Sequence, residues 1–323
     1  MMKKYRSSII LWLVFEAIAI WLWQATGNLF FLLNFSYIGF CIGFGGILFA
    51  AGWKYAREFT QFGVGTYMLV FLGLICRENM QIEGLWYYLL CGVWGAGTLH
   101  YTIAKIFGPL LFGSGWCGYA CWTAMILDLL PYKQPKAAIK REQSQASLDS
   151  AEREQARQKV KTPRTDDAAR AVRACSKMAE SRRTKTKSKN WGFIRYIMFG
   201  LSLAIVLLLF WLGKANAYTM FTLFVAGNIF YYAVSITLAI MQKDNRAFCK
   251  YICPITVFLK PMSYYSLIRI KCDEDKCISC GKCLKVCPME VEVNKNARSR
   301  KNATECILCQ KCTKACPTKA LSV

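Results

Sequence analysis

Residues 277–288 read CISCGKCLKVCP, and residues 306–317 read CILCQKCTKACP. Each run places four cysteines in the spacing C-x2-C-x2-C-x3-C and ends with proline. Cysteines at such short spacings indicate metal ligands rather than disulfides, because disulfide frameworks are typical of short secreted domains. Thiolate is a soft ligand that suits iron–sulfur clusters and zinc. Two interlocked four-cysteine runs that both end in proline favour iron–sulfur clusters over a pair of structural zinc knuckles.

The doubled run resembles the bacterial two-cluster ferredoxin domain. We therefore expect residues 272–323 to form that α+β domain around two [4Fe–4S] clusters, closed by short strands at IRIKC (268–272) and KALSV (319–323). In that domain three cysteines of one run bind a cluster and the fourth belongs to the other cluster. The resemblance implies a first cluster on Cys277, Cys280, Cys283 and Cys316. It implies a second cluster on Cys306, Cys309, Cys312 and Cys287.

The rest of the chain is strongly apolar. Hydrophobic residues make up 55% of the 323 residues, and they gather in blocks of the length that crosses a bilayer, about 20 residues. Six blocks qualify: 7–26, 29–53, 58–76, 84–107, 191–213 and 218–241. The fold expected is an α-helical polytopic membrane protein with about six transmembrane helices and a C-terminal ferredoxin domain.

The positions of the basic residues predict the orientation of these helices. Lys3 and Lys4 precede the first block and Lys105 ends the fourth, whereas the loops 77–83 and 214–217 carry one basic residue each. By the positive-inside rule, both termini and the ferredoxin domain are expected on the cytoplasmic side of a bacterial cell (inner) membrane. An even number of crossings agrees with this multi-pass topology.

Residues 132–190 divide the membrane region. They hold 17 Lys and Arg, 7 Asp and Glu and few large apolar side chains, so we expect a disordered basic linker near anionic headgroups. It separates 1–131, with four helices, from the last two helices in 191–241, and 242–271 then connects to the ferredoxin domain. Basic residues distributed in this way indicate membrane topology, and no nucleic-acid partner is expected.

Two further stretches, WCGYACW (116–122) and FCKYICP (248–254), each hold a pair of cysteines one helical turn apart. One pair follows the fourth predicted helix and the other follows the sixth, so both should emerge on the same side of the membrane. We expect helix packing to bring together the four cysteines Cys117, Cys121, Cys249 and Cys253. They could hold a further metal or cluster, form a dithiol that exchanges electrons with the ferredoxin domain, or simply pack as small apolar side chains.

These stretches, with Asp128, the membrane helices and the terminal runs, resemble the NapH-type membrane ferredoxins, which are membrane subunits of quinol dehydrogenases in anaerobic respiration. The resemblance is shared with the accessory protein of cbb3-type oxidases and with NosR-like proteins. The chain departs from the family pattern where Trp122, rather than proline, follows Cys121. The resemblance implies an electron-transfer subunit of a quinol dehydrogenase-type complex. Such a subunit passes electrons between the quinone pool and a protein redox partner through its two [4Fe–4S] clusters.

Two other functions fit the same residues: a copper reductase or assembly accessory protein, and a redox-sensing membrane regulator. Candidates for contact with a quinone or for proton transfer are Glu16, an acid inside the first predicted helix, and His100, the one histidine of the chain. Both side chains could equally be structural, Glu16 by pairing with a neighbouring helix and His100 as a buried, hydrogen-bonded residue.

Overall fold

The computed structural model describes residues 5–94, 96–132, 191–278, 280–294 and 303–323. The predicted basic linker is 132–190, and residues 133–190 of it lie outside these ranges. Within them, five helical segments are long and apolar enough to cross a membrane. They are α1 (Arg6–Thr26), α2 (Leu29–Ala51), α3 (Ala56–Thr66) continued by η2 (Tyr67–Ile75), α11 (Ile194–Trp211) and α12 (Ala217–Gln242). The predicted helical membrane fold with a C-terminal ferredoxin region is confirmed.

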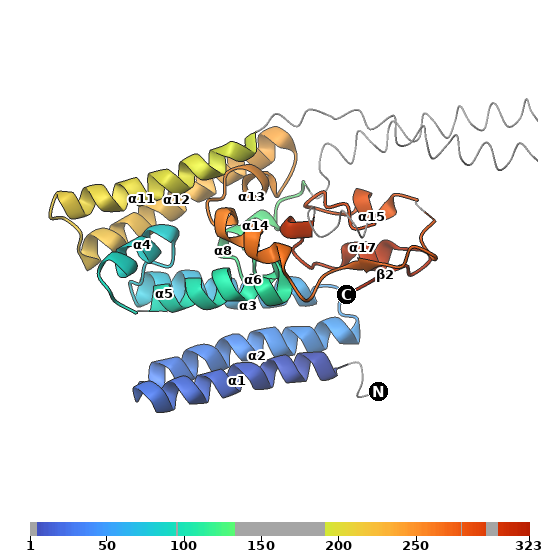
Figure 1. Ribbon diagram of the computed structural model, residues 1–323, viewed down its shortest axis with the longest axis horizontal. Coiled ribbons are helices and arrows are strands. Elements are labelled where there is room, and N and C mark those ends of the chain that lie inside the picture. The colour runs from blue at the N-terminus through green and yellow to red at the C-terminus, as the bar shows by residue number, and fades with distance from the viewer. Residues whose placement is uncertain (1–4, 95, 133–190, 279, 295–302) are drawn as a thin grey trace, which may run out of the picture.

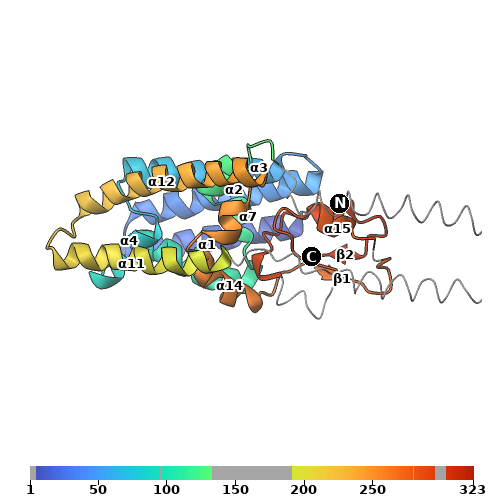
Figure 2. The same cartoon turned by 90° about the horizontal axis from the view of Figure 1, so that it is seen from above.

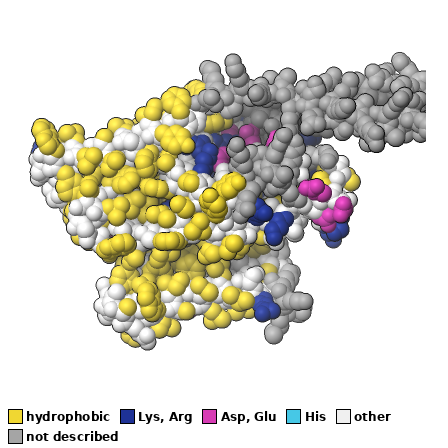
Figure 3. Space-filling model, in the orientation of Figure 1, with side chains coloured by type: hydrophobic (Ala, Val, Ile, Leu, Met, Phe, Trp, Pro, Cys, Tyr) yellow, Lys and Arg dark blue, Asp and Glu magenta, His cyan; other side chains and the backbone are white. Residues whose placement is uncertain are grey.

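The long helices lie side by side, and the ferredoxin region lies at one end of them (Figures 1 and 2). Large apolar side chains cover the outside of the helical part, while charged side chains gather towards the ferredoxin end (Figure 3). Leu33 on α2, Trp211 on α11 and Ile229 on α12 are 63%, 82% and 65% exposed. An apolar surface of this extent is typical of helices that face lipid.

The predicted fourth span, 84–107, differs from the single helix expected. The chain forms α4 (Ile82–Leu90), turns, and continues as α5 (Ala96–His100), η3 (Tyr101–Phe107) and α6 (Gly108–Phe112). Gly92 ends the first piece with a φ of +66°, a conformation that residues with a Cβ rarely adopt. Hydropathy reports how apolar a stretch of sequence is, but not whether its helix is continuous. The sequence therefore predicted one helix here.

The predicted external loop 77–83 also differs, because its second half folds back along α12. The Asn79 side chain donates to the Met220 carbonyl at 2.9 Å, and the Glu83 carboxylate lies 3.5 Å from the Tyr231 hydroxyl. Met220 and Tyr231 are eleven residues apart, or roughly 16 Å along a helix. Residues 79–82 are buried, as non-helical backbone at membrane depth must be.

A buried ion-pair network holds together the short helices at the ferredoxin end of the bundle. Arg57 of α3 reaches Asp128, which follows α8 (Trp122–Leu127), with Nη1 2.8 Å from Oδ2. Arg246, which precedes α13 (Ala247–Tyr251), donates to the same carboxylate through Nε at 3.0 Å and Nη2 at 2.5 Å. The network therefore joins three segments that are far apart in the sequence.

The C-terminal residues form the small α+β unit that the cysteine runs predicted. Strand β1 (Lys271–Cys272) pairs antiparallel with β2 (Leu321–Ser322), so the two flanking segments expected to be strands do close the domain. The short helices α15 (Lys282–Lys285) and α17 (Lys311–Ala315) each begin within one cysteine run. Their shared core includes Ile270, Val291 and Ile307.

This unit lies directly against α7 (Gly115–Tyr119), which carries Cys117 of the first cysteine pair. The Tyr119 hydroxyl donates to the Leu308 carbonyl at 3.0 Å, and the Ser114 hydroxyl donates to the Thr304 carbonyl at 2.7 Å. A Cβ on Gly118 would come within 2.4 Å of the Ile307 carbonyl oxygen. Only glycine allows this approach, so Gly118 determines how closely the ferredoxin unit packs on the bundle.

We expect Gly118→Ala to separate the ferredoxin unit from α7, because the added methyl group would clash with the Ile307 backbone. Overpacking of this kind costs about 1–3 kcal/mol, so hydrogen exchange at residues 304–308 should rise at least about fivefold. Gly200→Ala is the control, since a Cβ there meets no atom within 4 Å. Equal exchange in the two variants would contradict this account of the interface.

Candidate metal centres

Each predicted cluster set lines its own cavity in the ferredoxin unit. A cavity of about 360 Å³ is lined by Cys277, Cys280, Cys283 and Cys316. A second, of about 310 Å³, is lined by Cys287, Cys306, Cys309 and Cys312. The fourth cysteine of each run thus faces the cavity of the other run. The structure brings both sets together, while the iron ligation itself stays a prediction.

The donor chemistry of these cavities fits a cluster. Within the described ranges, no three Cys, His, Asp or Glu side chains are arranged to hold a single metal ion. Four thiols line each of the two cavities, and thiolate is the ligand that holds iron–sulfur clusters. Burial raises the pKa of both Cys306 and Cys312 to about 12. These thiols stay protonated at neutral pH until a metal displaces the proton, so loading would release protons.

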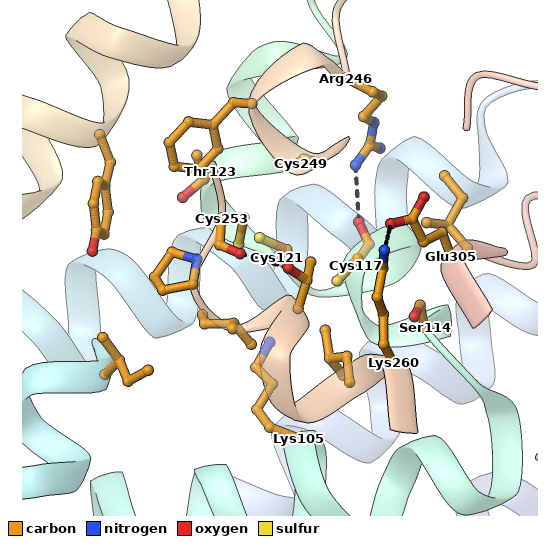
Figure 4. Close-up of a pocket in the computed structure, with 18 of the residues that line it drawn as sticks. Lys105, Ser114, Cys117, Cys121, Thr123, Arg246, Cys249, Cys253, Lys260 and Glu305 are labelled. Carbon is orange, nitrogen blue, oxygen red and sulfur yellow. Dashed lines mark hydrogen bonds and ion pairs between the residues drawn. The ribbon is translucent and has the colours of Figure 1, made fainter. Parts of the chain in front are cut away.

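A third and larger cavity, of about 870 Å³, lies where the membrane helices meet the ferredoxin unit (Figure 4). Both cysteine pairs line it, as expected from their matched positions. Cys117 comes from α7, Cys121 precedes α8, Cys249 belongs to α13, and Cys253 follows it. Burial raises the pKa of Cys117 to about 11 and that of Cys249 to about 12, and the neighbouring thiols contribute to both increases. We call this the four-cysteine cavity.

Two buried cations line the four-cysteine cavity. Arg246 is 1% exposed and donates from Nη1 to the Cys117 carbonyl at 3.2 Å. Lys105 is 2% exposed, with Nζ 5.4 Å from the centre of the Trp116 ring, and no ion pair involves it within the described ranges. Lys105 and Arg246 oppose the effect of burial on the Cys117 pKa, and Arg246 does the same for the Cys249 pKa, so positive charge favours the anionic, metal-binding form of these two thiols.

The Arg57–Asp128–Arg246 network also holds the backbone beside these thiols. Arg57 donates to the Gly118 carbonyl at 3.0 Å, next to the Cys117 carbonyl that Arg246 contacts. Burial alone would raise the Asp128 pKa, but the two guanidinium groups outweigh burial and hold the pKa below its ordinary value. The carboxylate is therefore ionised at neutral pH and pairs with both arginines.

The four-cysteine cavity is a direct neighbour of one cluster cavity. Met289 and Ile307 line both the four-cysteine cavity and the cavity of Cys287, Cys306, Cys309 and Cys312. Both side chains are buried, at 7% and 3% exposure. Two apolar side chains thus form a shared wall between the membrane-side thiols and the ferredoxin unit.

His100 and Glu16 lie away from this cavity. The His100 ring is 5.3 Å from the Trp116 ring, its Nε2 has no hydrogen-bond partner within the described residues, and it does not line the cavity. Glu16 accepts from Trp12 Nε1 at 3.0 Å and from the Ser36 hydroxyl at 2.7 Å, which joins α1 to α2. Their suggested roles with a quinone or proton stay predictions.

The cavity also includes residues that the sequence did not single out. Lys105 was interpreted only as a marker of topology, and Arg246, Gln81 and Tyr231 were not noticed. The available signal was a polar or charged residue within or beside an apolar block, such as the lysine of YTIAKIF (101–107). Sequence reasoning could not tell an interfacial residue from a buried one at that position.

Both groups of cysteines lie in stretches that match profiles of known protein families. The family profile described as a 4Fe-4S dicluster domain matches residues 276–321. A second profile, described as a 4Fe-4S binding domain, matches residues 101–136 and 219–271, which include both cysteine pairs of the membrane region. The chain therefore carries two 4Fe-4S ferredoxin-type domains.

Two curated proteins are similar over short stretches. An uncharacterized protein from Methanocaldococcus jannaschii is 35% identical over 48 residues, covering 15% of this chain and 20% of that protein. The provisionally named electron transport protein YccM from Escherichia coli K12 is 33% identical over 64 residues, covering 19% of this chain and 18% of YccM. The chain thus matches about a fifth of the length of each relative. No solved structure matches the chain.

We expect Asp128→Asn to destabilise the protein by about 3 kcal/mol, because it leaves the buried Arg246 guanidinium without a charge partner and removes one of the two carboxylates that pair with Arg57. Chemical unfolding in detergent would measure the loss. Glu58→Gln is the matched control, since Glu58 contacts Arg57 at 2.9 Å but has a side chain 41% exposed, and it should cost less than about 1 kcal/mol. Equal stability of the two variants would contradict the role of Asp128.

Proposed function

We propose that this protein is a membrane-bound iron–sulfur electron-transfer protein that moves electrons between a quinone or quinol in the lipid and a redox partner. The single observation that carries the proposal is the shared wall of Met289 and Ile307 between the four-cysteine cavity and a predicted cluster cavity. Because electron transfer slows steeply with distance, neighbouring redox sites form a path. This path would lead from the membrane helices into the ferredoxin unit.

In this proposal three centres form a relay. The thiols of Cys117, Cys121, Cys249 and Cys253 hold a membrane-side centre, and the profile match to a 4Fe-4S binding domain supports a cluster there. The second centre is held by Cys287, Cys306, Cys309 and Cys312, and the third by Cys277, Cys280, Cys283 and Cys316. The clusters supply the redox chemistry, and the protein supplies ligands, burial and charge.

The wider context of the proposal comes from resemblance. NapH-type proteins suggest the role of a quinol dehydrogenase membrane subunit, with the ferredoxin unit on the cytoplasmic side and a separate protein as redox partner. The similarity to YccM, which is named as an electron transport protein, supports electron transfer over copper handling or sensing.

Iron and acid-labile sulfide in anaerobically purified protein test the membrane-side centre. Cys249→Ser should lose about a third of both, because one of three four-iron clusters is lost, while Cys91→Ser, at an exposed cysteine outside the cavities, should lose none. Stoichiometric copper on the four thiols, with the iron content of Cys249→Ser unchanged, would overturn the proposal in favour of copper handling.

We expect Lys105→Met to lower the reduction potential of the membrane-side centre. A cluster on four thiolates gains negative charge on reduction, so a buried ammonium group favours the reduced state. Removal of the charge should shift the potential by on the order of 60 mV, equivalent to about 1.4 kcal/mol for one electron. An EPR-monitored redox titration measures this shift. Lys105→Arg should retain the wild-type potential, and a Lys105→Met potential equal to wild type would refute the electrostatic role.

A further inference from the structure

One polar side chain that lines the four-cysteine cavity has no hydrogen-bond partner among the described residues. Gln81 lines this cavity and is 3% exposed, and neither its Oε1 nor its Nε2 has a hydrogen-bond partner within the described residues. A Cβ on Gly227 would lie 2.4 Å from Gln81 Oε1, so the glycine makes space for the amide group. A buried amide without a partner costs about 1–3 kcal/mol, which a ligand would recover.

Further polar groups lie beside Gln81. Tyr231 lines the same cavity, and its hydroxyl lies 3.5 Å from Glu83 Oε1. The second carboxylate oxygen of Glu83, Oε2, and the hydroxyl of Tyr101 are buried without a partner in the described residues. Around them the cavity wall is apolar, with Ile82, Trp122, Phe248, Ile255 and Leu259. A few polar groups in an apolar cavity are typical of sites for small organic ligands.

The four-cysteine cavity is larger than the cavities predicted to hold one cluster each. It measures about 870 Å³, against about 360 and 310 Å³ for those two by the same measure. It therefore extends beyond the space that its four thiols need for a metal centre.

We infer that Gln81 and Tyr231 form the binding site for the headgroup of a lipid-soluble hydroquinone. Glu83 does not line the cavity, but it lies 3.5 Å behind the Tyr231 hydroxyl and accepts the protons. The inference rests on the proposed function and locates the site of its lipid-soluble carrier. A carboxamide can accept a hydrogen bond from the hydroxyl of a hydroquinone and donate one to the carbonyl of a quinone, so Gln81 suits both redox forms. Tyr231 can do the same at its hydroxyl.

The chemistry balances with the centres already proposed. Oxidation of the hydroquinone breaks two O–H bonds and releases two electrons and two protons. Each electron reduces one oxidised iron–sulfur centre of the relay. Each proton passes to the Glu83 carboxylate, which releases the first to water before it accepts the second. Glu83 is thus a proton acceptor, and Gln81 and Tyr231 are binding residues.

Menadione and its hydroquinone menadiol, added to the cluster-loaded full-length protein in detergent without oxygen, test the site. Menadione binding is measured by the quenching of tryptophan fluorescence. Gln81→Leu should weaken binding about tenfold, because the amide loses its hydrogen bonds to the ligand. Tyr231→Phe should weaken binding to a lesser degree. Tyr232→Phe is the matched control on the same helix, since the Tyr232 hydroxyl donates to the Trp122 carbonyl, and it should bind as wild type.

Reduction of the clusters by menadiol tests the proton acceptor. Glu83→Gln should bind menadione within about threefold of wild type but be reduced about a hundredfold more slowly. Dithionite, which needs no binding site, should reduce every variant alike.

Unchanged binding and unchanged reduction in the Gln81, Glu83 and Tyr231 variants would overturn the site, while the proposed function would stand if menadiol still reduces the clusters. Failure of menadiol to reduce the wild-type clusters would overturn the quinol-linked function, and the binding series would still decide the site. Binding that does not saturate in wild type would overturn the site.

Discussion

The arrangement of the four-cysteine cavity depends on one partly buried carboxylate between two guanidinium groups. Asp128 pairs with Arg57 and Arg246, and the same two arginines donate to the carbonyls of Gly118 and Cys117. A helix near the start of the chain, the first cysteine pair and the segment that carries the second pair are thereby held in one place. Charges buried this deeply are stable only when paired, so the network specifies a single arrangement of the four thiols.

The membrane helices and the ferredoxin unit contribute different parts of the four-cysteine cavity. The bundle supplies the two cysteine pairs, the cations Lys105 and Arg246, and the polar side chain of Gln81. The ferredoxin unit supplies the apolar wall and two further four-cysteine cavities. The contact between them is tight because Gly118 has no side chain to keep the Ile307 backbone away. Both parts are needed to form the series of redox sites that we propose.

The sequence predicted those features that depend on local spacing or composition. The cysteine runs indicated the ferredoxin unit and its flanking strands, and apolar blocks located the five long helices. It did not predict the return of residues 79–83 into the bundle, because hydropathy does not record where a helix breaks. Nor did it predict the burial of Arg57 and Arg246, whose shared partner Asp128 is 71 and 118 residues distant. Ion pairs between residues this far apart in the sequence can be identified only from the folded structure.

The wall formed by Met289 and Ile307 has a consequence for the energetics of charge movement. Both side chains are apolar and nearly inaccessible, so little water or mobile charge lies between the two neighbouring cavities. In the proposed relay, an electron that crosses this wall would cause few dipoles to reorient around the donor and the acceptor. The reorganisation energy of that step would be small, so a modest difference in potential between the two centres would be enough to drive it.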